Sequence, residues 1–200
     1  IKDDEGEFLV FSIPVKENVS SPQITKYLHW VEHFSEQYNV SQALIFAIME
    51  TESSFNPSAI SRSNAIGLMQ LKANSAGKDV YQYVDKRDGM PSSKDLLDSE
   101  NNIRMGSAYL GLLKHEYLAD VRNRQSKELL AISSYNGGLS TVLKLFGASS
   151  EHALHRINQL HPKQVYRTLR NHHHSDETRR YLDKVLRAKS KYQELLDLNV

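Results

Sequence analysis

From Ser20 onward, apolar residues recur at every third or fourth position along the chain, which is the spacing of one face of an α-helix. A first helix is predicted to begin at Pro22, with Ser21 as its cap, because proline is favoured in the first helical turn. A second helix is predicted over 42–53, behind a cap at Ser41. It is apolar on nearly all sides, so we expect it to lie in the core.

The rest of the chain alternates between turn signals and helical spacing. Asn56–Pro57 is predicted to stop the second helix, and residues 57–72 and 87–95 are rich in turn residues and are expected to be loops. Ser126 is predicted to cap a helix that ends at Gly137–Gly138. Further helices are expected over 74–84, 100–118, 140–146, 150–159, 162–170 and 175–196. The pattern therefore predicts an all-α fold of eight or nine helices.

The start of the chain has a different pattern. Residues 8–15 have the apolar and β-branched density of a strand, and Pro14 places that strand at an edge or an end. A lone strand does not stabilise itself, so it needs a partner elsewhere. We therefore expect residues 1–19 to be a short extended segment, the last part of a preceding domain, and residues 20–200 to form one helical domain.

Composition excludes several classes of protein. The 200 residues are 40% hydrophobic, enough for the core of one domain. The chain has 25 basic and 24 acidic side chains, so it lacks the basic excess of a nucleic-acid binder. It has no cysteine, which excludes disulfides and thiolate chemistry, and no apolar run of the ~18 residues that span a membrane. Neighbours in the run His172–His174 cannot all face one metal ion from a helix, so a solvated turn is expected there.

Two glutamates stand at the end of the second predicted helix, and they cannot share one task. At ~100° per residue, Glu50 and Glu52 point about 200° apart. Glu52 lies where the helix gives way to a turn, close in sequence to Phe55 and Ile48. Apolar neighbours disfavour the charged carboxylate and raise its pKa, as a general acid at neutral pH requires. The alternative is an ordinary solvated glutamate at a helix end.

Three motifs follow one another along the chain: ESSFNP, GLMQ and SYNGG. In this order they resemble the motifs of the lysozyme-like lytic transglycosylases of bacterial cell walls. The longer stretch AIMETESSFNPSAISRSNAIGLMQ is similar to the membrane-bound C type of that family, and the similarity continues through NNIRMGSAYL and ETRRYLDKV. The resemblance implies a lysozyme-like helical domain of the goose-type or soluble-lytic-transglycosylase kind.

The resemblance also implies roles for individual residues. The family's catalytic acid falls on Glu52, and a tyrosine of the last helix, Tyr181, approaches it. Substrate contacts fall on Ser61, Ser63, Gly67, Met69, Gln70, Tyr135 and Asn136. Structural interpretations stay open for several of these: the two serines as turn residues, Met69 and Tyr181 as core side chains, and the third motif as a helix end.

A single carboxylate is unusual for glycoside cleavage, which normally uses two. It suits the reaction of this family, in which the C6 hydroxyl of the substrate takes the place of water. The resemblance thus implies cleavage of peptidoglycan glycan strands to 1,6-anhydromuramoyl ends, with no metal or organic cofactor and no nucleic acid. It also implies a periplasmic protein held at the outer membrane by a lipid anchor absent from this sequence. The alternatives are a hydrolytic muramidase with an unrecognised aspartate and a peptidoglycan-binding module without turnover.

Overall fold

The computed structural model describes residues 21–173 and 175–198, so the predicted strand within 1–19 and the boundary at residue 20 lie outside the described residues. The described chain is mostly helical, as predicted. Its α-helices are α1 (Pro22–Tyr38), α2 (Gln42–Ser53), α3 (Ser93–Leu97), α4 (Ser99–Leu112), α5 (Arg124–Gly137), α6 (Leu139–Lys144), α7 (Ser150–Gln159), α8 (Pro162–His172) and α9 (Asp176–Asp197). The remaining elements are the π-helical turns η1 (Ala73–Gly77), η2 (Val80–Val84) and η3 (Leu113–Tyr117), and the strands β1 (Ala65–Ile66) and β2 (Leu71–Lys72).

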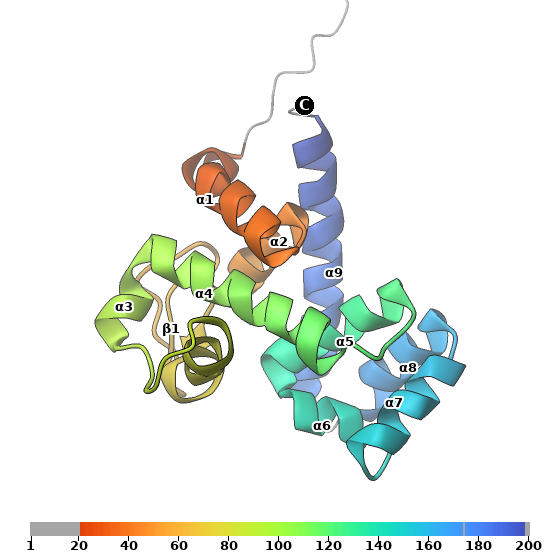
Figure 1. Ribbon diagram of the computed structural model, residues 1–200. Helices are drawn as coiled ribbons and strands as arrows, with labels where there is room; N and C mark the ends of the chain where they lie inside the picture. The colour runs from red at the N-terminus through yellow and green to blue at the C-terminus, as the bar shows by residue number, and fades with distance from the viewer. Residues whose placement is uncertain (1–20, 174, 199–200) are drawn as a thin grey trace, which may run out of the picture.

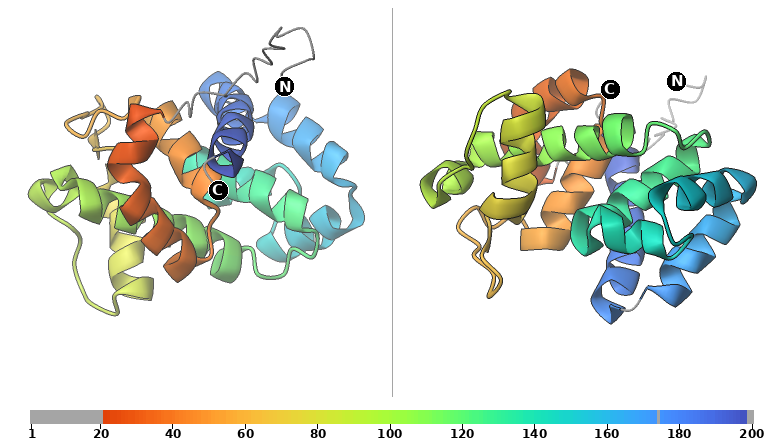
Figure 2. Two further views of the ribbon diagram at one scale, coloured as in Figure 1. Left: turned by 90° about the horizontal axis from the view of Figure 1, so that it is seen from above. Right: turned by 60° about the horizontal axis from the view of Figure 1, so that its bottom comes forward.

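Helices α2 and α9 pack along each other in the middle of the domain (Figure 1). Every residue from Ala43 to Met49 of α2 is buried, which confirms the predicted core helix. The strands and α3 lie on one side of this pair, and α5 to α8 lie on the other, with α4 crossing between the two sides (Figures 1 and 2). The side formed by the strands and α3 therefore meets the side formed by α5 to α8 near the end of α2 and the start of α9.

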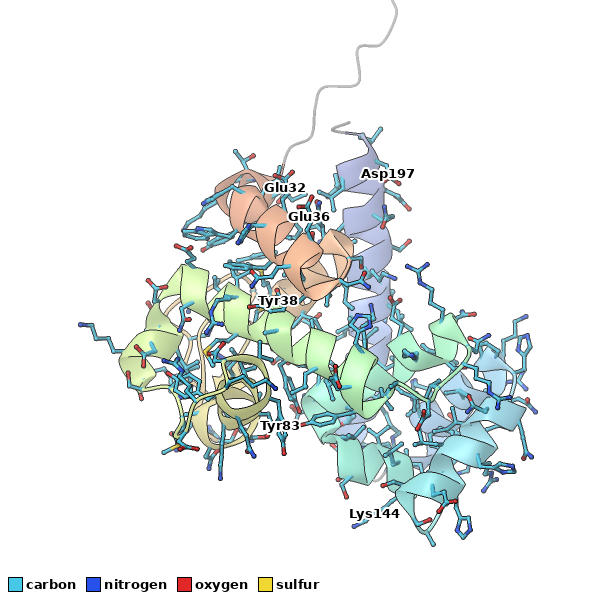
Figure 3. All side chains as sticks on the ribbon, viewed as in Figure 1. Glu32, Glu36, Tyr38, Tyr83, Lys144 and Asp197 are labelled. Carbon is cyan, nitrogen blue, oxygen red and sulfur yellow. The ribbon has the colours of Figure 1, made fainter. Side chains whose placement is uncertain are left out.

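Helix α1 shows how the apolar spacing becomes burial. Its residues Ile24, Tyr27 and Val31 are buried, and α1 packs against α4. Glu32 and Glu36 lie on its exposed side (Figure 3). Ser21 is the N-cap residue and Pro22 begins the helix, as predicted, but the Ser21 side chain accepts no bond from the helix; its hydroxyl donates to the Gln23 side chain at 2.6 Å.

Other helix ends agree with the predictions or differ by a few residues. Ser41 caps α2 by accepting from the Leu44 N–H at 3.3 Å. The cap of α5 is Asn123 and not Ser126, because the Asn123 side chain accepts from the backbone N–H of Ser126 at 3.0 Å. Helix α2 spans Gln42–Ser53, the predicted range, but it ends ahead of Asn56–Pro57 because the next two residues adopt left-handed backbone conformations.

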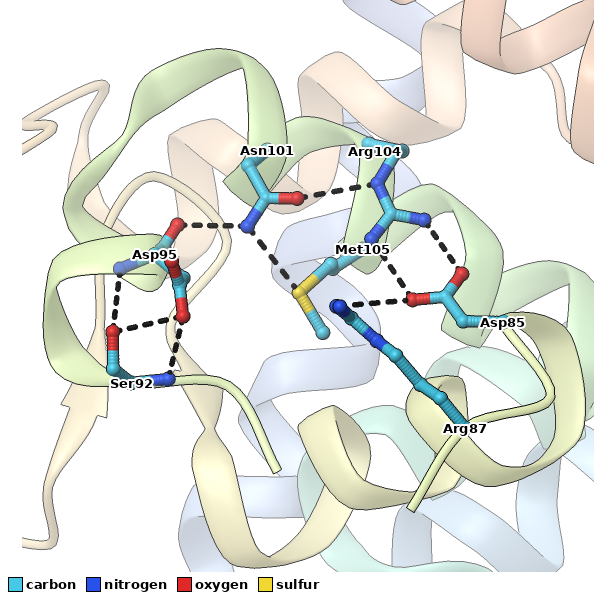
Figure 4. A network of polar contacts seen from close by, with 7 residues as sticks. All are labelled: Asp85, Arg87, Ser92, Asp95, Asn101, Arg104 and Met105. Atoms are coloured by element: carbon cyan, nitrogen blue, oxygen red, sulfur yellow. Dashed lines mark hydrogen bonds and ion pairs between the residues drawn. The ribbon is translucent and has the colours of Figure 1, made fainter. Parts of the chain in front are cut away.

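Both predicted loops contain regular structure. Strands β1 and β2 pair antiparallel inside 57–72, with Ala65 opposite Lys72. Helix α3 begins inside 87–95, where Ser92 and Asp95 cap each other. Figure 4 shows how Arg104 of α4 holds the preceding turn, donating to both carboxylate oxygens of Asp85 at 2.9 and 3.2 Å. No helix in residues 21–173 or 175–198 is both long and apolar enough to cross a membrane.

Candidate active site

A cleft of about 690 Å³ opens between the end of α2, the β1–β2 region, the end of α5 and the start of α9. These are the segments that carry the three motifs and the last predicted helix. Of the predicted site residues, the cleft is lined by Glu52, Ser61, Ser63, Gln70, Tyr135, Asn136 and Tyr181. Predicted site residues as far as 129 positions apart in the sequence (52 and 181) thus meet in one hollow.

Glu52 is the half-buried carboxyl group of this cleft. It stands in the last turn of α2, and the chain leaves the helix at once because Ser54 and Phe55 have φ of 50° and 64°. Burial raises the pKa of Glu52 to about 7; the Tyr181 hydroxyl acts in the opposite direction, and the negative charge of Glu177 raises the pKa further. The carboxyl group is therefore available as a proton donor near neutral pH.

Two tyrosines adjoin Glu52, and both keep their protons. Burial and the charge of Glu52 raise the pKa of Tyr135 and of Tyr181 well above the ordinary value. The Tyr135 hydroxyl donates to the carbonyl oxygen of Met69 at 2.9 Å. Tyr181 is 5% exposed, so it is a core residue of α9 and a wall of the cleft at the same time.

Glu50 occupies a contrasting environment two residues earlier. Its carboxylate accepts hydrogen bonds from the Lys191 ammonium and from the Tyr192 hydroxyl of α9. Burial raises the pKa of Glu50, but these two contacts outweigh burial and the net shift is downward. Glu50 is therefore an ionised link between α2 and α9, whereas Glu52 faces the cleft.

The two serines support the turn that forms one edge of the cleft. The Ser61 hydroxyl oxygen accepts from the Ala65 N–H at 3.0 Å and from the Ser63 N–H at 3.3 Å. The hydroxyls of Ser61 and Ser63 are 3.1 Å apart. The interpretation of Ser61 as a turn residue thus holds, and both side chains line the cleft as well.

Gln70 braces the same edge from its other end. Its backbone is left-handed, with φ of 47°, and its side-chain amide nitrogen donates to the carbonyl oxygens of Ala59 at 3.1 Å and Gly67 at 2.9 Å. A carboxamide has two N–H donors and one oxygen acceptor. Because the side-chain nitrogen already donates to two carbonyl groups of the loop, the amide oxygen is the part of Gln70 suited to contact a ligand in the cleft.

Gly67 and Met69 lie behind the cleft wall, which corrects the expectation that each approaches a sugar. The Met69 side chain is 0% exposed, and its Sδ would lie 2.2 Å from a Cβ added to Gly106. Gly67 has φ of 80°, and a Cβ there would come within 2.3 Å of the side-chain nitrogen of Asn102. Packing against α4 explains both residue types.

Asn102 is the residue of this region that sequence reasoning missed. It is fully buried, and its side-chain oxygen accepts from the Met69 N–H at 2.8 Å. Its amide nitrogen donates to the carbonyl oxygens of Ile66 at 2.9 Å and Leu96 at 2.7 Å. All three bonds serve buried backbone groups, which must be satisfied. An asparagine beside Ile103, on the apolar side of a predicted helix, was the available signal.

The start of α9 adds further cleft residues that were not predicted, among them Glu177, Thr178 and Lys184. The Thr178 hydroxyl donates to the side-chain oxygen of Asn136 at 2.8 Å, which joins α9 to the end of α5.

His173 does not lie in a solvated turn, contrary to the expectation for the histidine run. It is 1% exposed and lines the cleft, and its Nδ1 accepts from the Ser175 N–H at 3.1 Å.

Metal-ligating side chains do not gather in the cleft. Throughout the described ranges, no three His, Asp or Glu residues lie close enough together to hold a metal ion. The cleft offers one carboxyl group with a raised pKa, protonated tyrosines, and serine and amide groups on a braced loop. This combination suits proton transfer to a polyhydroxylated ligand.

Comparison with solved structures identifies the fold. The chain superposes on the 70 kDa soluble lytic transglycosylase from Escherichia coli with a TM-score of 0.65 and 23% identity, over 85% of this chain and 24% of that chain. The complex of the 70 kDa soluble lytic transglycosylase with bulgecin A gives a TM-score of 0.67 at 24% identity, over 87% of this chain and 25% of that chain. Similarity at this identity concerns the fold alone, and it confirms the predicted lysozyme-like, soluble-lytic-transglycosylase-like fold.

Sequence comparison with curated proteins gives nearer relatives. The membrane-bound lytic murein transglycosylase C of Pectobacterium atrosepticum is 44% identical over 194 residues, covering 96% of this chain and 54% of the relative. The protein of the same name from Sodalis glossinidius is 47% identical over 168 residues, covering 84% of this chain and 47% of the relative. The chain therefore spans about half the length of the curated relatives it matches.

The family assignment follows from the match along the chain itself. The profile of the transglycosylase SLT domain matches residues 30–157, which is more than half of the chain and includes all three motifs. The relatives in sequence and the fold agree with it. This protein belongs to the transglycosylase SLT domain family.

Proposed function

We propose that this protein is a peptidoglycan lytic transglycosylase. It cleaves the β-1,4 bond between N-acetylmuramic acid and N-acetylglucosamine and leaves a 1,6-anhydromuramoyl end. The observation that carries the proposal is the state of Glu52, a half-buried carboxyl group in the cleft whose pKa is raised to about 7. The family assignment and the names of the relatives, lytic murein transglycosylases, support the substrate.

In the proposed reaction Glu52 acts twice. Its carboxyl proton passes to the glycosidic oxygen as the bond from that oxygen to muramoyl C1 breaks. The resulting carboxylate then removes the proton of the muramoyl C6 hydroxyl while that oxygen bonds to C1. Glu52 ends protonated, as it began, and no water is consumed. A pKa near the working pH serves both steps, since the group must give and take a proton.

The neighbours of Glu52 have roles that fit this cycle. Tyr181 interacts with the carboxyl group and favours its ionised form, so it stabilises the state between the two proton transfers. Tyr135 fixes the carbonyl of Met69 and with it the loop that bears Gln70. Ser61, Ser63, Gln70 and Asn136 present hydroxyl and amide groups to sugar hydroxyls and acetamides. These are proposed substrate contacts.

The test is mass spectrometry of the muropeptides that the purified protein releases from peptidoglycan. Anhydromuramoyl products, lighter by one water than reducing ends, are expected. Glu52→Gln should lower their release by a factor of about 10² or more, the typical contribution of general acid–base catalysis. Glu50→Gln is the matched control, because it makes the same change two residues away and outside the cleft, and it should retain activity. Release by Glu52→Gln at the wild-type rate would refute the assignment of Glu52.

Glu177 gives a specific reason to keep a second candidate, a hydrolytic muramidase. Glycoside hydrolases use two carboxyl groups, and Glu177 lines the same cleft as Glu52 and raises its pKa. Reducing ends among the products, lost in Glu177→Gln, would establish hydrolysis. Binding of glycan strands without any release would instead indicate a binding module.

We also propose where the protein acts. The relatives are named membrane-bound, which supports attachment to a membrane. A peptidoglycan substrate supports a reaction in the periplasm, and we propose that a lipid anchor of the full-length protein holds it at the outer membrane. Fractionation of cells that express the full-length protein, with membrane association lost after removal of the anchoring segment, tests this placement.

A further inference from the structure

A second hollow of about 440 Å³ adjoins the cleft. The two hollows share Thr51 of α2 and Lys184 of α9 in their walls. A ligand strand that lies in the cleft would therefore have the second hollow at its side. Arg187 and Lys191 of α9 also line this hollow, together with Glu50 from α2.

The hollow is cationic because of the spacing of three residues on α9. Lys184, Arg187 and Lys191 stand at positions i, i+3 and i+7, which lie on one face of a helix, and all three are exposed. Lys191 is neutralised by Glu50. Within residues 21–173 and 175–198, neither Lys184 nor Arg187 forms an ion pair with a carboxylate.

Asp183, the acidic residue next to Lys184 on α9, does not neutralise Lys184 or Arg187. The carboxylate of Asp183 accepts from the Arg170 guanidinium at 2.6 Å and from the Tyr166 hydroxyl at 2.8 Å. Arg187 donates one N–H to the backbone oxygen of Asp183 at 3.2 Å, which orients the guanidinium and leaves its other donors for a ligand. The wall beside the cleft thus presents two positive charges that the described protein does not compensate.

We propose that Lys184 and Arg187 form a subsite for a carboxylate of the peptides attached to the glycan strand. This inference rests on the proposed function, because peptidoglycan is a glycan whose muramoyl residues carry short peptides with carboxyl groups. A guanidinium and an ammonium are the side chains that bind carboxylates most strongly, and the guanidinium can do so through two parallel hydrogen bonds. The subsite would favour strands with peptides over strands whose peptides are uncharged.

An anionic lipid surface is the other ligand that such charges could attract. The observations favour the peptide, since the cations line a hollow that shares Thr51 and Lys184 with the cleft proposed to bind the glycan. A membrane-binding patch would need cations on a surface that a flat bilayer can reach. The two ligands are separated by the experiment.

The experiment measures binding, so that it does not depend on turnover. Glu52→Gln protein is sedimented with insoluble peptidoglycan in two forms: native, and with its peptide carboxyl groups converted to amides. The expected apparent Kd for the native form is about threefold to tenfold lower than for the amidated form, the range for two exposed ion pairs. The preference should shrink with added salt. Adding Lys184→Gln and Arg187→Gln should bring the ratio of the two Kd values to about one.

The matched control is Lys163→Gln with Arg167→Gln on α8. It removes the same two kinds of charge from exposed positions at i and i+4, and neither residue lines the cleft or the second hollow. This variant should keep the preference for native peptidoglycan. The subsite would be overturned if the variant with Lys184→Gln and Arg187→Gln preferred native over amidated peptidoglycan as strongly as its parent, the Glu52→Gln protein, does. It would also be overturned by loss of binding to vesicles of anionic phospholipid without any change in the peptidoglycan ratio.

The proposed function fails in a different way. If wild-type protein released no anhydromuramoyl products from either form of peptidoglycan, transglycosylation would be refuted, while the ratio of the Kd values would still report on the subsite. If products appeared but the ratio were one for the parent protein, the subsite would be refuted and the reaction would stand.

Discussion

Glu50 and Glu52 stand two residues apart on α2, and their surroundings shift their pKa values in opposite directions. Glu50 meets Lys191 and Tyr192 and is held ionised, whereas Glu52 lines the cleft and holds its proton to about pH 7. One helix end thus carries both an ionic link to α9 and a candidate proton donor. Because the two pKa shifts are opposite, replacing each glutamate with glutamine should change the stability of the protein in opposite directions.

Replacing Glu52 with glutamine is expected to stabilise the protein at alkaline pH. The pKa of Glu52 is about 7 in the folded state against an ordinary value of 4.5, so the folded state binds the proton more tightly. Wild-type stability must then fall as pH rises from about 4.5 to 7, and Glu52→Gln escapes this loss. At pH 8 the variant should gain up to about 3 kcal/mol, and at pH 4 about nothing. Urea unfolding at both pH values checks this; a variant less stable than wild type at pH 8 contradicts it.

Replacing Glu50 with glutamine is expected to destabilise the protein, the opposite of the effect expected for Glu52→Gln. The pKa of Glu50 is lowered in the folded state, so its contribution is present above about pH 4.5 and is lost at more acidic pH. The side chain is 35% exposed, so solvent screens the ion pair and the loss at pH 7 should be about 1 kcal/mol. Urea unfolding should show this difference at pH 7 and a smaller one at pH 3. Equal stability at pH 7 would mean that the link is not stabilising.

The rate of glycan cleavage is expected to fall above neutral pH. In the proposed mechanism the free enzyme is active only when Glu52 carries its proton, and the pKa of about 7 means that this proton is lost around neutral pH. The value of kcat/KM should therefore fall about tenfold per pH unit on the alkaline side. Initial rates of anhydromuropeptide release between pH 5 and pH 9 give the profile. A rate that is constant from pH 6 to pH 9 would contradict protonation by Glu52.

Tyr181→Phe separates a role in the reaction from simple packing. The hydroxyl lowers the pKa of Glu52, so its removal should raise that pKa and move the alkaline limb of kcat/KM to higher pH. The maximal rate should fall about tenfold if the hydroxyl stabilises the carboxylate between the two proton transfers. Phenylalanine keeps the ring in the core. An unchanged profile and rate would leave Tyr181 with a packing role only.

Asn102→Ala is expected to destabilise the protein by about 2–4 kcal/mol. The substitution leaves three buried backbone groups without their partners, at Ile66, Met69 and Leu96. It should also raise KM, because the loop that bears Gln70 loses its attachment to α4. The control is Asn171→Ala at an exposed position, which should change stability by less than about 0.5 kcal/mol. Thermal unfolding with KM measurements checks both effects.

The sequence predicted the parts of the fold that depend on local chemistry. The core helix α2 and the amphipathic α9 lie within a few residues of their predicted ranges, because apolar spacing and a nearby cap or proline determine them. The β1–β2 pair was missed, since strands of two residues have no periodicity. The left-handed Phe55 could not be predicted either: its ring stacks on Tyr27 and packs against Phe46 and Tyr192, which are distant contacts.

The sequence also predicted part of the candidate site. The motifs led to Glu52, Tyr135 and Tyr181, and the structure brings all three to one cleft. Their assignment as a catalytic and binding set stays a proposal. The motifs did not distinguish side chains that face the cleft from a residue such as Met69, which supports it from behind. Nor did they reveal Glu177, an exposed residue whose importance comes only from how α9 packs on α2.

The bonds from Asn102 and Tyr135 to the two sides of Met69 have a consequence for binding thermodynamics. They hold the loop in one conformation before any ligand arrives, so the loop gives up its conformational entropy during folding and not during association. A glycan that enters the cleft then loses only its own freedom. Recognition should therefore be limited by the flexibility of the saccharide, and rigid mimics of the strand would gain more affinity than additional contacts to the loop.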